Sequence, residues 1–317
     1  MKKRADQIKG IEAALASALF LGLAPVFGKQ AITLGFSPLA VVAFRTIMAA
    51  ALLLLIVAII RRPYLYIYPA GLMGCTLAGA LNGLGSLFYY FALGRLSVSV
   101  AQLLYSLYPV FLVIWLVIER QPPSRLTYFR MGFALLGIIF LTLSSSIQMD
   151  WIGVILMLSA SIMYAIHLPI NQRVLYDIPA PTVTLYTLLA MSLVVVPAYL
   201  IFDRHLPPTG TPWTPILALT VVTFFSRLML FLGIKNLGGM QTALLGLSEL
   251  FVSITISHLW LHESLNSNQW IGASFLGLSL ILIGFEKIQP EKNRIRGLLG
   301  WLRPSEITPD IPLGPHD

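Results

Sequence analysis

Two ionisable side chains lie deep inside apolar stretches of the sequence, where a charge is costly unless it has a partner or a function. Arg227 comes eight residues before Lys235, and Glu249 lies about nine residues into the apolar run that starts at residue 240. At about 1.5 Å per helical residue, both would lie roughly 12–14 Å from the same membrane boundary. Arg227 could hold a carboxylate and Glu249 could accept a proton, which indicates a site that binds a solute or responds to protons. A buried structural ion pair between them is the alternative interpretation.

Neutral polar side chains accompany these charges at helical spacing. Three recur at positions i, i+4 and i+8 of one apolar segment, and three more at i, i+3 and i+6 of the next. Several are tyrosines, whose ring and hydroxyl suit an amphipathic or aromatic solute, although core packing is the alternative for any single one. The predicted substrate-binding residues are Asn82, Ser86, Tyr90, Gln102, Tyr105, Tyr108, Tyr164, Arg227 and Glu249.

Other residues could shape such a site without binding the solute. Pro25 and Pro169 lie at nearly matching positions of the two halves and predict hinges or kinks, with simple packing kinks as the alternative. The segment 79–85 is rich in glycine and permits either close helix packing or a thin cavity wall. For Arg45 we predict that it reaches the membrane interface or bonds a neighbouring helix, and substrate contact is the alternative.

The composition shows which class of protein must position these residues. The chain has 317 residues, of which 57% are hydrophobic and 11% are charged. Soluble domains carry about 25% charged residues, so an ordinary soluble enzyme is excluded. The net charge of +8 is scattered along the chain, which argues against a nucleic-acid partner. A single cysteine, Cys75, excludes a disulfide framework and a cysteine-based metal site.

The apolar residues are grouped into segments of membrane-spanning length. If the N-terminus lies in the cytoplasm, the cytoplasmic segments hold 16 of the 21 Lys and Arg residues and the opposite segments hold three. This bias predicts that both termini are cytoplasmic and that the number of spans is even. The predicted spans are residues 11–33, 38–60, 67–93, 97–118, 127–144, 151–171, 182–202, 213–234, 240–261 and 269–286.

The two halves of the chain resemble each other. Residues 91–96 align with 232–237, and residues 132–137 align with 272–277, at an offset of about 140 residues. Because each unit holds an odd number of spans, five, the second copy must cross the membrane in the opposite direction. We therefore predict an all-α integral membrane protein with ten transmembrane helices as two inverted five-helix repeats. The predicted divisions are a first repeat at 1–144, a second repeat at 145–288 and a cytoplasmic tail at 289–317.

Residues 91–140 and 232–284, together with Arg45 in the second span, resemble the EamA-type branch of the drug/metabolite transporter superfamily. The resemblance covers roughly residues 11–286 and implies a secondary transporter that exports small metabolites. Two positions depart from the family's pattern. Glu119 comes later after Pro109 than the family's glutamate does, and Leu250 stands where a proline is expected.

These observations predict a transporter of amino acids or related amphipathic compounds, working by alternating access in a plasma membrane, specifically a bacterial inner membrane. The expected partners are a small-molecule solute, the lipid bilayer and a coupling proton, and the chain would act as a monomer or homodimer. No cofactor or metal is predicted, and the sequence has no GxxxxGK[ST] or GxSxG motif of an enzyme. A nucleotide-sugar or phosphate-ester carrier of the same superfamily is the first alternative. A membrane-embedded enzyme or a non-transporting scaffold is the second.

Overall fold

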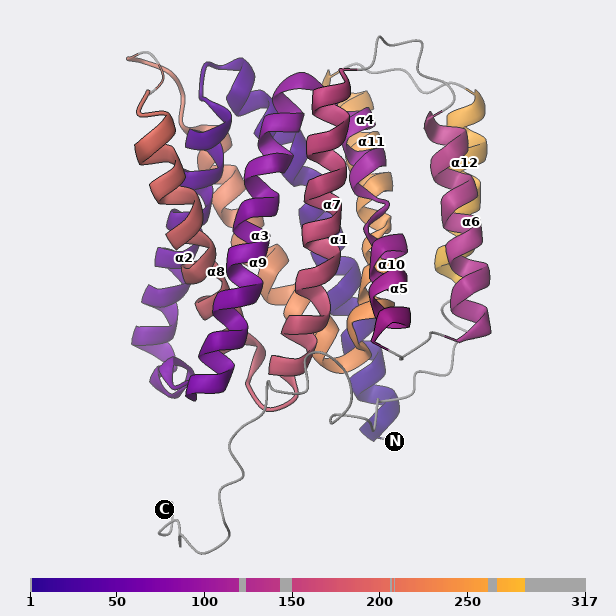
Figure 1. Cartoon of the computed structure of the whole chain (residues 1–317), viewed down its shortest axis with the longest axis horizontal. Coiled ribbons are helices and arrows are strands. Elements are labelled where there is room, and N and C mark those ends of the chain that lie inside the picture. The colour runs from indigo at the N-terminus through magenta and orange to yellow at the C-terminus, as the bar shows by residue number, and fades with distance from the viewer. Residues whose placement is uncertain are drawn as a thin grey trace, which may run out of the picture.

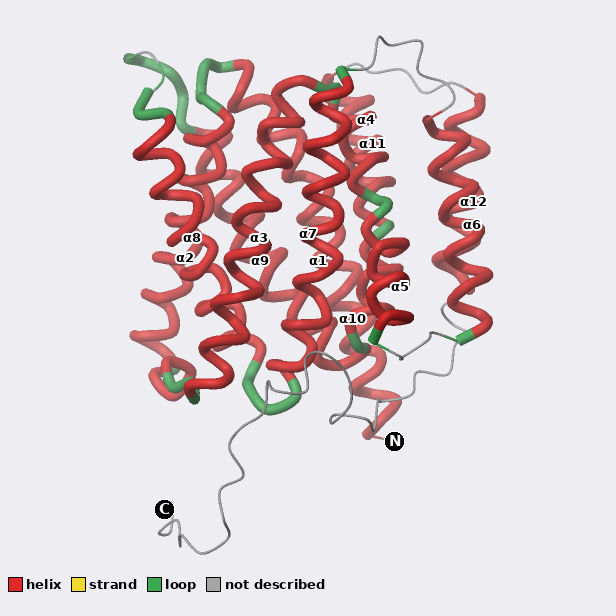
Figure 2. Tube along the Cα trace, viewed as in Figure 1, coloured by secondary structure: helices red, strands yellow, loops and turns green. Residues whose placement is uncertain are grey.

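The computed structural model describes residues 2–119, 124–142, 150–205, 207, 209–261 and 267–282, and these residues form helices joined by turns (Figures 1 and 2). None of the described residues belongs to a strand, so the predicted all-α class is confirmed for this part of the chain. The helices are α1 (Lys2–Thr33), α2 (Pro38–Ile60), the short 3-10 helix η1 (Arg62–Leu65), α3 (Pro69–Arg95), α4 (Val98–Tyr105), α5 (Tyr108–Ile118), α6 (Arg125–Thr142), α7 (Trp151–Leu175), α8 (Ala180–Phe202), α9 (Thr214–Leu237), α10 (Gly239–Gly246), α11 (Ser248–Leu261) and α12 (Ser267–Ile281).

Six of these helices are long and apolar enough to cross a membrane, namely α1, α2, α3, α7, α8 and α9. Each has at least 23 residues, and a span needs about 20. The chain is therefore a multi-pass membrane protein. The prediction of ten spans stays a prediction, because each of the remaining helices is shorter than a membrane span of about 20 residues.

Two of the predicted spans are interrupted helices in the structure. Ser106 and Leu107 separate α4 from α5, and Leu247 separates α10 from α11. The apolar sequence runs through both breaks, so sequence periodicity alone did not reveal them. Pro109, in the first turn of α5, has no amide hydrogen and cannot donate to the carbonyl of Tyr105, where α4 ends. The second break places Glu249 in the first turn of α11, where the helix dipole favours a negative charge.

Local sequence signals explain where several helices begin. Ser37 accepts a hydrogen bond from the Ala40 amide at 3.1 Å, and Pro38 follows it as the first residue of α2. Asp150 caps α7 by accepting from the amides of Ile152 and Gly153 at 2.9 and 3.1 Å. These caps satisfy amide groups that have no partner inside the helix, and they hold the helix starts in place.

The helices of one half pack mainly on those of the other half. Helix α1 lies against α9, and α3 lies against α7. Helix α2 meets α8, while α6 and α12 pair with each other at one edge of the bundle, on the right of Figure 1. If the first five spans correspond to the last five, α1 corresponds to α7 and α3 corresponds to α9. The contact of α1 with α9 is then equivalent to the contact of α7 with α3.

Glycines permit the closest of these approaches. A Cβ atom on Gly79 of α3 would lie 2.5 Å from the backbone oxygen of Thr187 in α8. A Cβ on Gly83, one turn further, would lie 3.0 Å from the Cβ of Val194. The glycine-rich segment therefore packs α3 directly on the backbone of α8, which was one of its two predicted roles.

Candidate substrate-binding site

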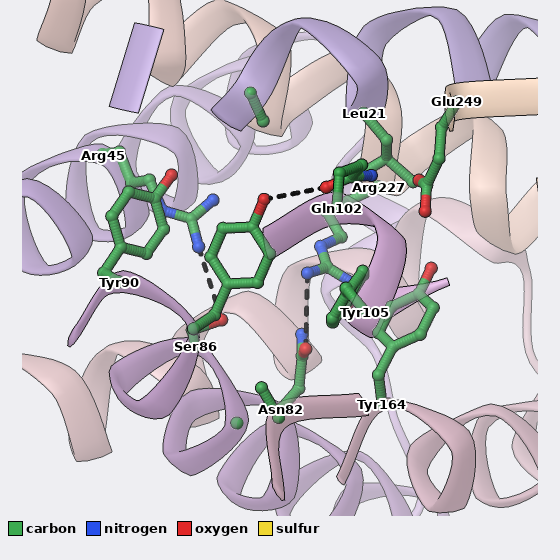
Figure 3. A pocket seen from close by; sticks show the side chains of 14 residues that line it. Leu21, Arg45, Asn82, Ser86, Tyr90, Gln102, Tyr105, Tyr164, Arg227 and Glu249 are labelled. Carbon is green, nitrogen blue, oxygen red and sulfur yellow. Dashed lines mark hydrogen bonds between the residues drawn. The ribbon is translucent and has the colours of Figure 1, made fainter. Parts of the chain in front are cut away.

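A buried cavity of about 50 Å³ lies in the middle of the bundle, between helices of both halves (Figure 3). Seven helices contribute to its wall, namely α1, α2, α3, α4, α7, α9 and α11. A volume of this size holds only a few water molecules. The lining residues are Leu21, Ala24, Arg45, Asn82, Gly85, Ser86, Tyr89, Tyr90, Gln102, Tyr105, Ala160, Tyr164, Arg227 and Glu249.

The structure brings together eight of the nine residues predicted to bind substrate. Tyr108 is the exception, because its hydroxyl donates to the backbone oxygen of Ala243 in α10 at 2.8 Å, behind the cavity wall. Its ring packs edge-on against the ring of Tyr164, with the centroids 4.8 Å apart. Tyr108 therefore supports the wall and joins the broken segment α4–α5 to α10.

Arg227 reaches the cavity from α9 and is 5% exposed. Its Nη2 donates to the Oδ1 atom of Asn82 in α3 at 3.3 Å. Its guanidinium carbon also lies 5.9 Å from the centre of the Tyr164 ring. Glu249 lines the same cavity, so the ion pair with Arg227 considered from the sequence stays an alternative interpretation.

Glu249 faces the same cavity from the first turn of α11 and is 2% exposed. Its Oε1 atom is buried and has no hydrogen-bond partner in the part of the chain that the structure describes. A buried oxygen without a partner costs free energy, more so if it is charged. The backbone of Glu249 is held close to α1, since a Cβ atom on Gly22 would lie only 2.6 Å from the Glu249 backbone oxygen.

Arg45 also lines the cavity, although it was not among the predicted site residues. Its two terminal nitrogens donate to the hydroxyls of Thr223 in α9 at 3.2 Å and of Ser86 in α3 at 3.3 Å. Its guanidinium lies 4.7 Å from the centre of the Tyr90 ring, which is a cation–π contact. Of the two roles predicted for Arg45, the helix-to-helix hydrogen bond is the one that the structure shows. Its position inside an apolar span was the signal that could have placed it beside Arg227.

Tyr89 is a second lining residue that the sequence argument left out. Its hydroxyl donates to the Oε1 atom of Gln102 at 3.0 Å, and its ring packs edge-on against that of Tyr105, with centroids 5.0 Å apart. Positions 82, 85, 86, 89 and 90 all line the cavity and follow the i, i+3, i+4, i+7, i+8 spacing of a wide helix face. The predicted face of α3 used only every fourth residue and was too narrow to include Tyr89.

Both predicted hinge prolines lie inside helices, Pro25 in α1 and Pro169 in α7. Proline has no amide hydrogen, so Pro25 cannot donate to the carbonyl of Leu21, four residues earlier. Leu21 and Ala24 both line the cavity, so the weakened turn of α1 forms part of its wall. A hinge role for either proline remains a prediction.

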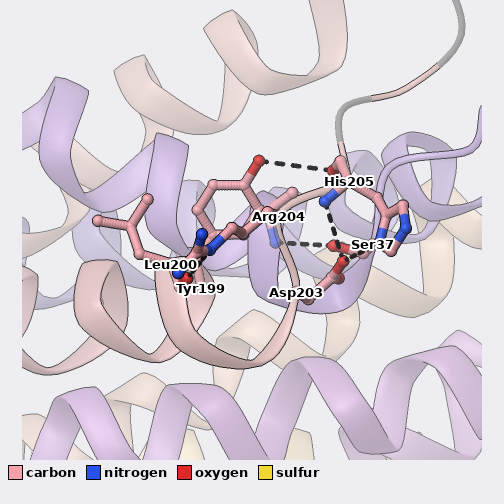
Figure 4. Close-up of polar contacts among 7 residues, drawn as sticks. Ser37, Tyr199, Leu200, Asp203, Arg204 and His205 are labelled. Atoms are coloured by element: carbon pink, nitrogen blue, oxygen red, sulfur yellow. Dashed lines mark hydrogen bonds and ion pairs between the residues drawn. The ribbon is translucent and has the colours of Figure 1, made fainter.

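Polar contacts join the two halves of the chain at the end of the bundle opposite the N-terminus (Figure 4). Asp203, just after α8, accepts from both the amide and the Nδ1 of His205, at 3.2 and 2.9 Å. A hydrogen bond from Ser37, before α2, is the main reason that the pKa of Asp203 lies below its usual value. At the same end Arg95 donates to Asp150 at 2.9 Å, and this bond is the main cause of the lowered pKa of Asp150.

A buried ion pair joins the halves near the other end of the bundle. The Nη2 atom of Arg173, in α7, lies 4.0 Å from the Oε2 atom of Glu119, at the end of α5. Glu119 is the residue that departs from the family's spacing, and the structure places it outside the cavity lining. Its contact with Arg173 is structural in character.

Comparison with known proteins settles the family. The profile of the EamA-like transporter family matches residues 8–143 and, a second time, residues 151–285. The chain belongs to the EamA-like transporter family. A similar member is an uncharacterized transporter of Synechocystis sp., which is 26% identical over 238 residues, or 70% of this chain and 68% of that protein. This EamA-like protein is therefore a membrane transporter, as the sequence resemblance predicted.

The fold of this EamA-like chain is also found in a solved crystal structure. The two structures superpose with a TM-score of 0.69 over 89% of this chain and 97% of the other. Their sequences are 15% identical, so the likeness concerns the fold alone.

Proposed function

We propose that this chain is a secondary transporter of small metabolites, namely amino acids or related amphipathic compounds. The observation that carries the proposal is the buried cavity in which Arg45, Arg227 and Glu249 meet from helices of both halves. An arginine binds a carboxylate through charge-assisted hydrogen bonds, and Glu249 is suited to an ammonium group. The tyrosine rings would contact the body of the solute.

Two inverted five-helix repeats, 1–144 and 145–288, followed by a tail at 289–317, form the architecture that we propose. Ten spans result if α4 with α5 and α10 with α11 each count as one interrupted span. The packing between the halves supports this arrangement, because α1 packs on α9 and the equivalent pair, α7 and α3, also packs together. The repeated match of the family profile supports it as well. The tail lies outside the described residues.

Alternating access is the mechanism that this architecture favours. The cavity of about 50 Å³ is too small for an amino acid, so the helices around it must separate before a solute can enter. Rocking of one repeat against the other would open the cavity to each side in turn. The contacts at the two ends, Asp203 with Ser37 and Glu119 with Arg173, link the halves and would have to open alternately.

We place the transporter in the plasma membrane of a bacterium, the inner membrane, with both termini in the cytoplasm. The distribution of Lys and Arg, 16 against three, supports this orientation. Glu249 is the proposed proton acceptor, since its buried Oε1 atom has no hydrogen-bond partner among the described residues and a proton there would remove the cost of burying the charge. The transporter would work as a monomer or homodimer.

Flux into proteoliposomes tests the proposed function. Purified full-length protein is reconstituted and offered a panel of labelled amino acids and organic acids, with and without a pH gradient. We expect uptake of at least one compound, and we expect Glu249→Gln to change the rate or its pH dependence. Glu12→Gln is the matched control, because Glu12 lies on the exposed face of α1. Folded protein that moves no compound of the panel would contradict transport of this class of solute.

A phosphate-ester or nucleotide-sugar carrier is the second candidate function. From the sequence, one cation, Arg227, was expected at the cavity, but Arg45 lines it as well. Two arginines could bind a phosphate group. The same proteoliposomes, preloaded with a sugar nucleotide or a phosphorylated sugar, distinguish the candidates: exchange of these compounds without exchange of amino acids favours this carrier.

A further inference from the structure

The cavity carries more positive than negative charge. Among its lining residues, Arg45 and Arg227 are cations and Glu249 is the one acid. Arginine keeps its proton in proteins, whereas a buried carboxyl can be ionised or neutral. The net charge of the lining is therefore +1 when Glu249 is ionised and +2 when it is protonated. In both states the cavity lacks at least one negative charge.

The contacts of Arg45 leave its charge without an acid partner at the cavity. Its hydrogen bonds go to two neutral hydroxyls, those of Thr223 and Ser86, and its buried Nε atom has no partner among the described residues. The ring of Tyr90 gives only partial compensation. A buried charge without a counter-ion is costly, and two cations beside one small cavity add their repulsion. Figure 3 shows both guanidinium groups among the side chains of the cavity.

We infer that the solute is an organic acid of net charge −1, with a carboxylate bound by Arg45 and Arg227. This inference rests on the proposed function and narrows it. A monocarboxylate with an aromatic body meets the requirement, and so does an amino acid with a second carboxylate. With Glu249 ionised, such a solute brings the loaded cavity to zero charge. A zwitterion leaves it at +1, an amine raises it to +2, and a doubly charged phosphate ester takes it to −1.

Charge balance matters most when the cavity is closed. Arg45, Arg227 and Glu249 are each at least nine-tenths buried, so water screens their charges weakly. A loaded cavity without net charge avoids the cost of holding an excess charge inside the bilayer while the halves rearrange. The solute of net charge −1 therefore favours the closed state through which transport must pass.

A series of solutes with the same ring and different charge tests the inference. The compounds are 3-(4-hydroxyphenyl)propionate at −1, tyrosine at zero and tyramine at +1, with glutamate and glutamine as a second pair that lacks the ring. Their affinities for the purified full chain are measured by calorimetry at pH 7. We expect the acid to bind about tenfold more tightly than the zwitterion in each pair, because the acid leaves the loaded cavity without the excess positive charge that the zwitterion leaves there.

Two variants should move this preference in opposite directions. Arg45→Gln lowers the cavity charge by one and should shift binding toward tyrosine and glutamine. Glu249→Gln raises it by one and should widen the preference for the acids. A general loss of folding cannot shift the acid preference in opposite directions in the two variants. If Arg45→Gln fails to fold, the acid preference of Glu249→Gln alone tests the charge inference.

The outcomes separate the two proposals. If the wild-type protein binds tyrosine as tightly as the matching acid, or if neither variant changes the ratio, the charge inference is overturned while transport of amino acids stands. If the folded protein binds no compound of either series, the proposed function itself fails.

Discussion

The contact between α1 and α11 at Gly22 offers a sharp test of how the cavity is built. A Cβ atom at this position would lie 2.6 Å from the backbone oxygen of Glu249 and 2.6 Å from the Cβ of Val252. Ordinary van der Waals contact begins at about 3.4 Å, so a Gly22→Ala variant needs about 0.8 Å of additional space. Neither obstacle can swing away, because one belongs to the backbone and the other is fixed to it.

The expected cost follows from this overlap. Overpacking of a close contact costs about 1–3 kcal/mol of unfolding free energy. The relief available is a movement of the first turn of α11 away from α1, and this turn carries the Glu249 carboxyl. We therefore expect Gly22→Ala to lower the unfolding temperature and to weaken solute binding together.

Gly132→Ala provides the matched control. A Cβ on Gly132, in α6, would have no neighbouring atom within 4 Å, and this position is exposed in the bundle. Alanine is the better helix former by up to about 1 kcal/mol, so this variant should unfold at or slightly above the wild-type temperature. Both variants are compared by thermal unfolding in the same detergent and by solute affinity. If Gly22→Ala unfolds no earlier than Gly132→Ala, the close contact of α1 with α11 is wrong.

Three further predictions concern polar contacts. Tyr108→Phe removes a donor to a backbone oxygen of α10 and should cost about 1 kcal/mol in thermal unfolding; an unchanged unfolding curve would show that the bond is unimportant. The lowered pKa of Asp150 means that its bond with Arg95 adds stability above the ordinary aspartate pKa, and that this stability is lost as pH falls through the lowered pKa. Asp150→Asn keeps a capping side chain but should flatten this acid dependence, and an unaltered pH profile of unfolding would contradict it. Ser37→Ala should lower the free energy of unfolding by about 1 kcal/mol through the lost helix cap. It should also raise the pKa of Asp203, and an unchanged pH dependence of unfolding would contradict the bond between Ser37 and Asp203.

Much of the candidate site could be predicted because burying polar groups in a membrane is costly. Arg227 and Glu249 stand out in the sequence for this reason, and the structure brings them to one cavity. Arg45 satisfies the same criterion, but its role depends on Thr223 and Ser86, which are distant in the sequence. Contacts of this kind are set by helix packing and leave no local pattern.

The positions of helices followed from apolar length, whereas their interruptions did not. Asp150 and Ser37 stand at helix starts, as their capping chemistry favours. The breaks after Tyr105 and before Ser248 lie within apolar runs, and Pro109 after the first break removes the hydrogen bond to the Tyr105 carbonyl. The bond of Tyr108 to α10 is a tertiary contact beside that break. The same contact explains why Tyr108 lies behind the wall although its spacing matches that of Tyr105.

Solute protection of a single cysteine in the cavity tests the central claim most directly. In a Cys75→Ala background the chain has no other thiol, and Ser86→Cys places one in the cavity wall with little change in size. We expect a membrane-impermeant thiol reagent to modify this cysteine from either side of the membrane, and a transported solute to slow the reaction from both sides. A cysteine that reacts at the same rate with and without a transported solute would contradict the assignment of this cavity as the transport site.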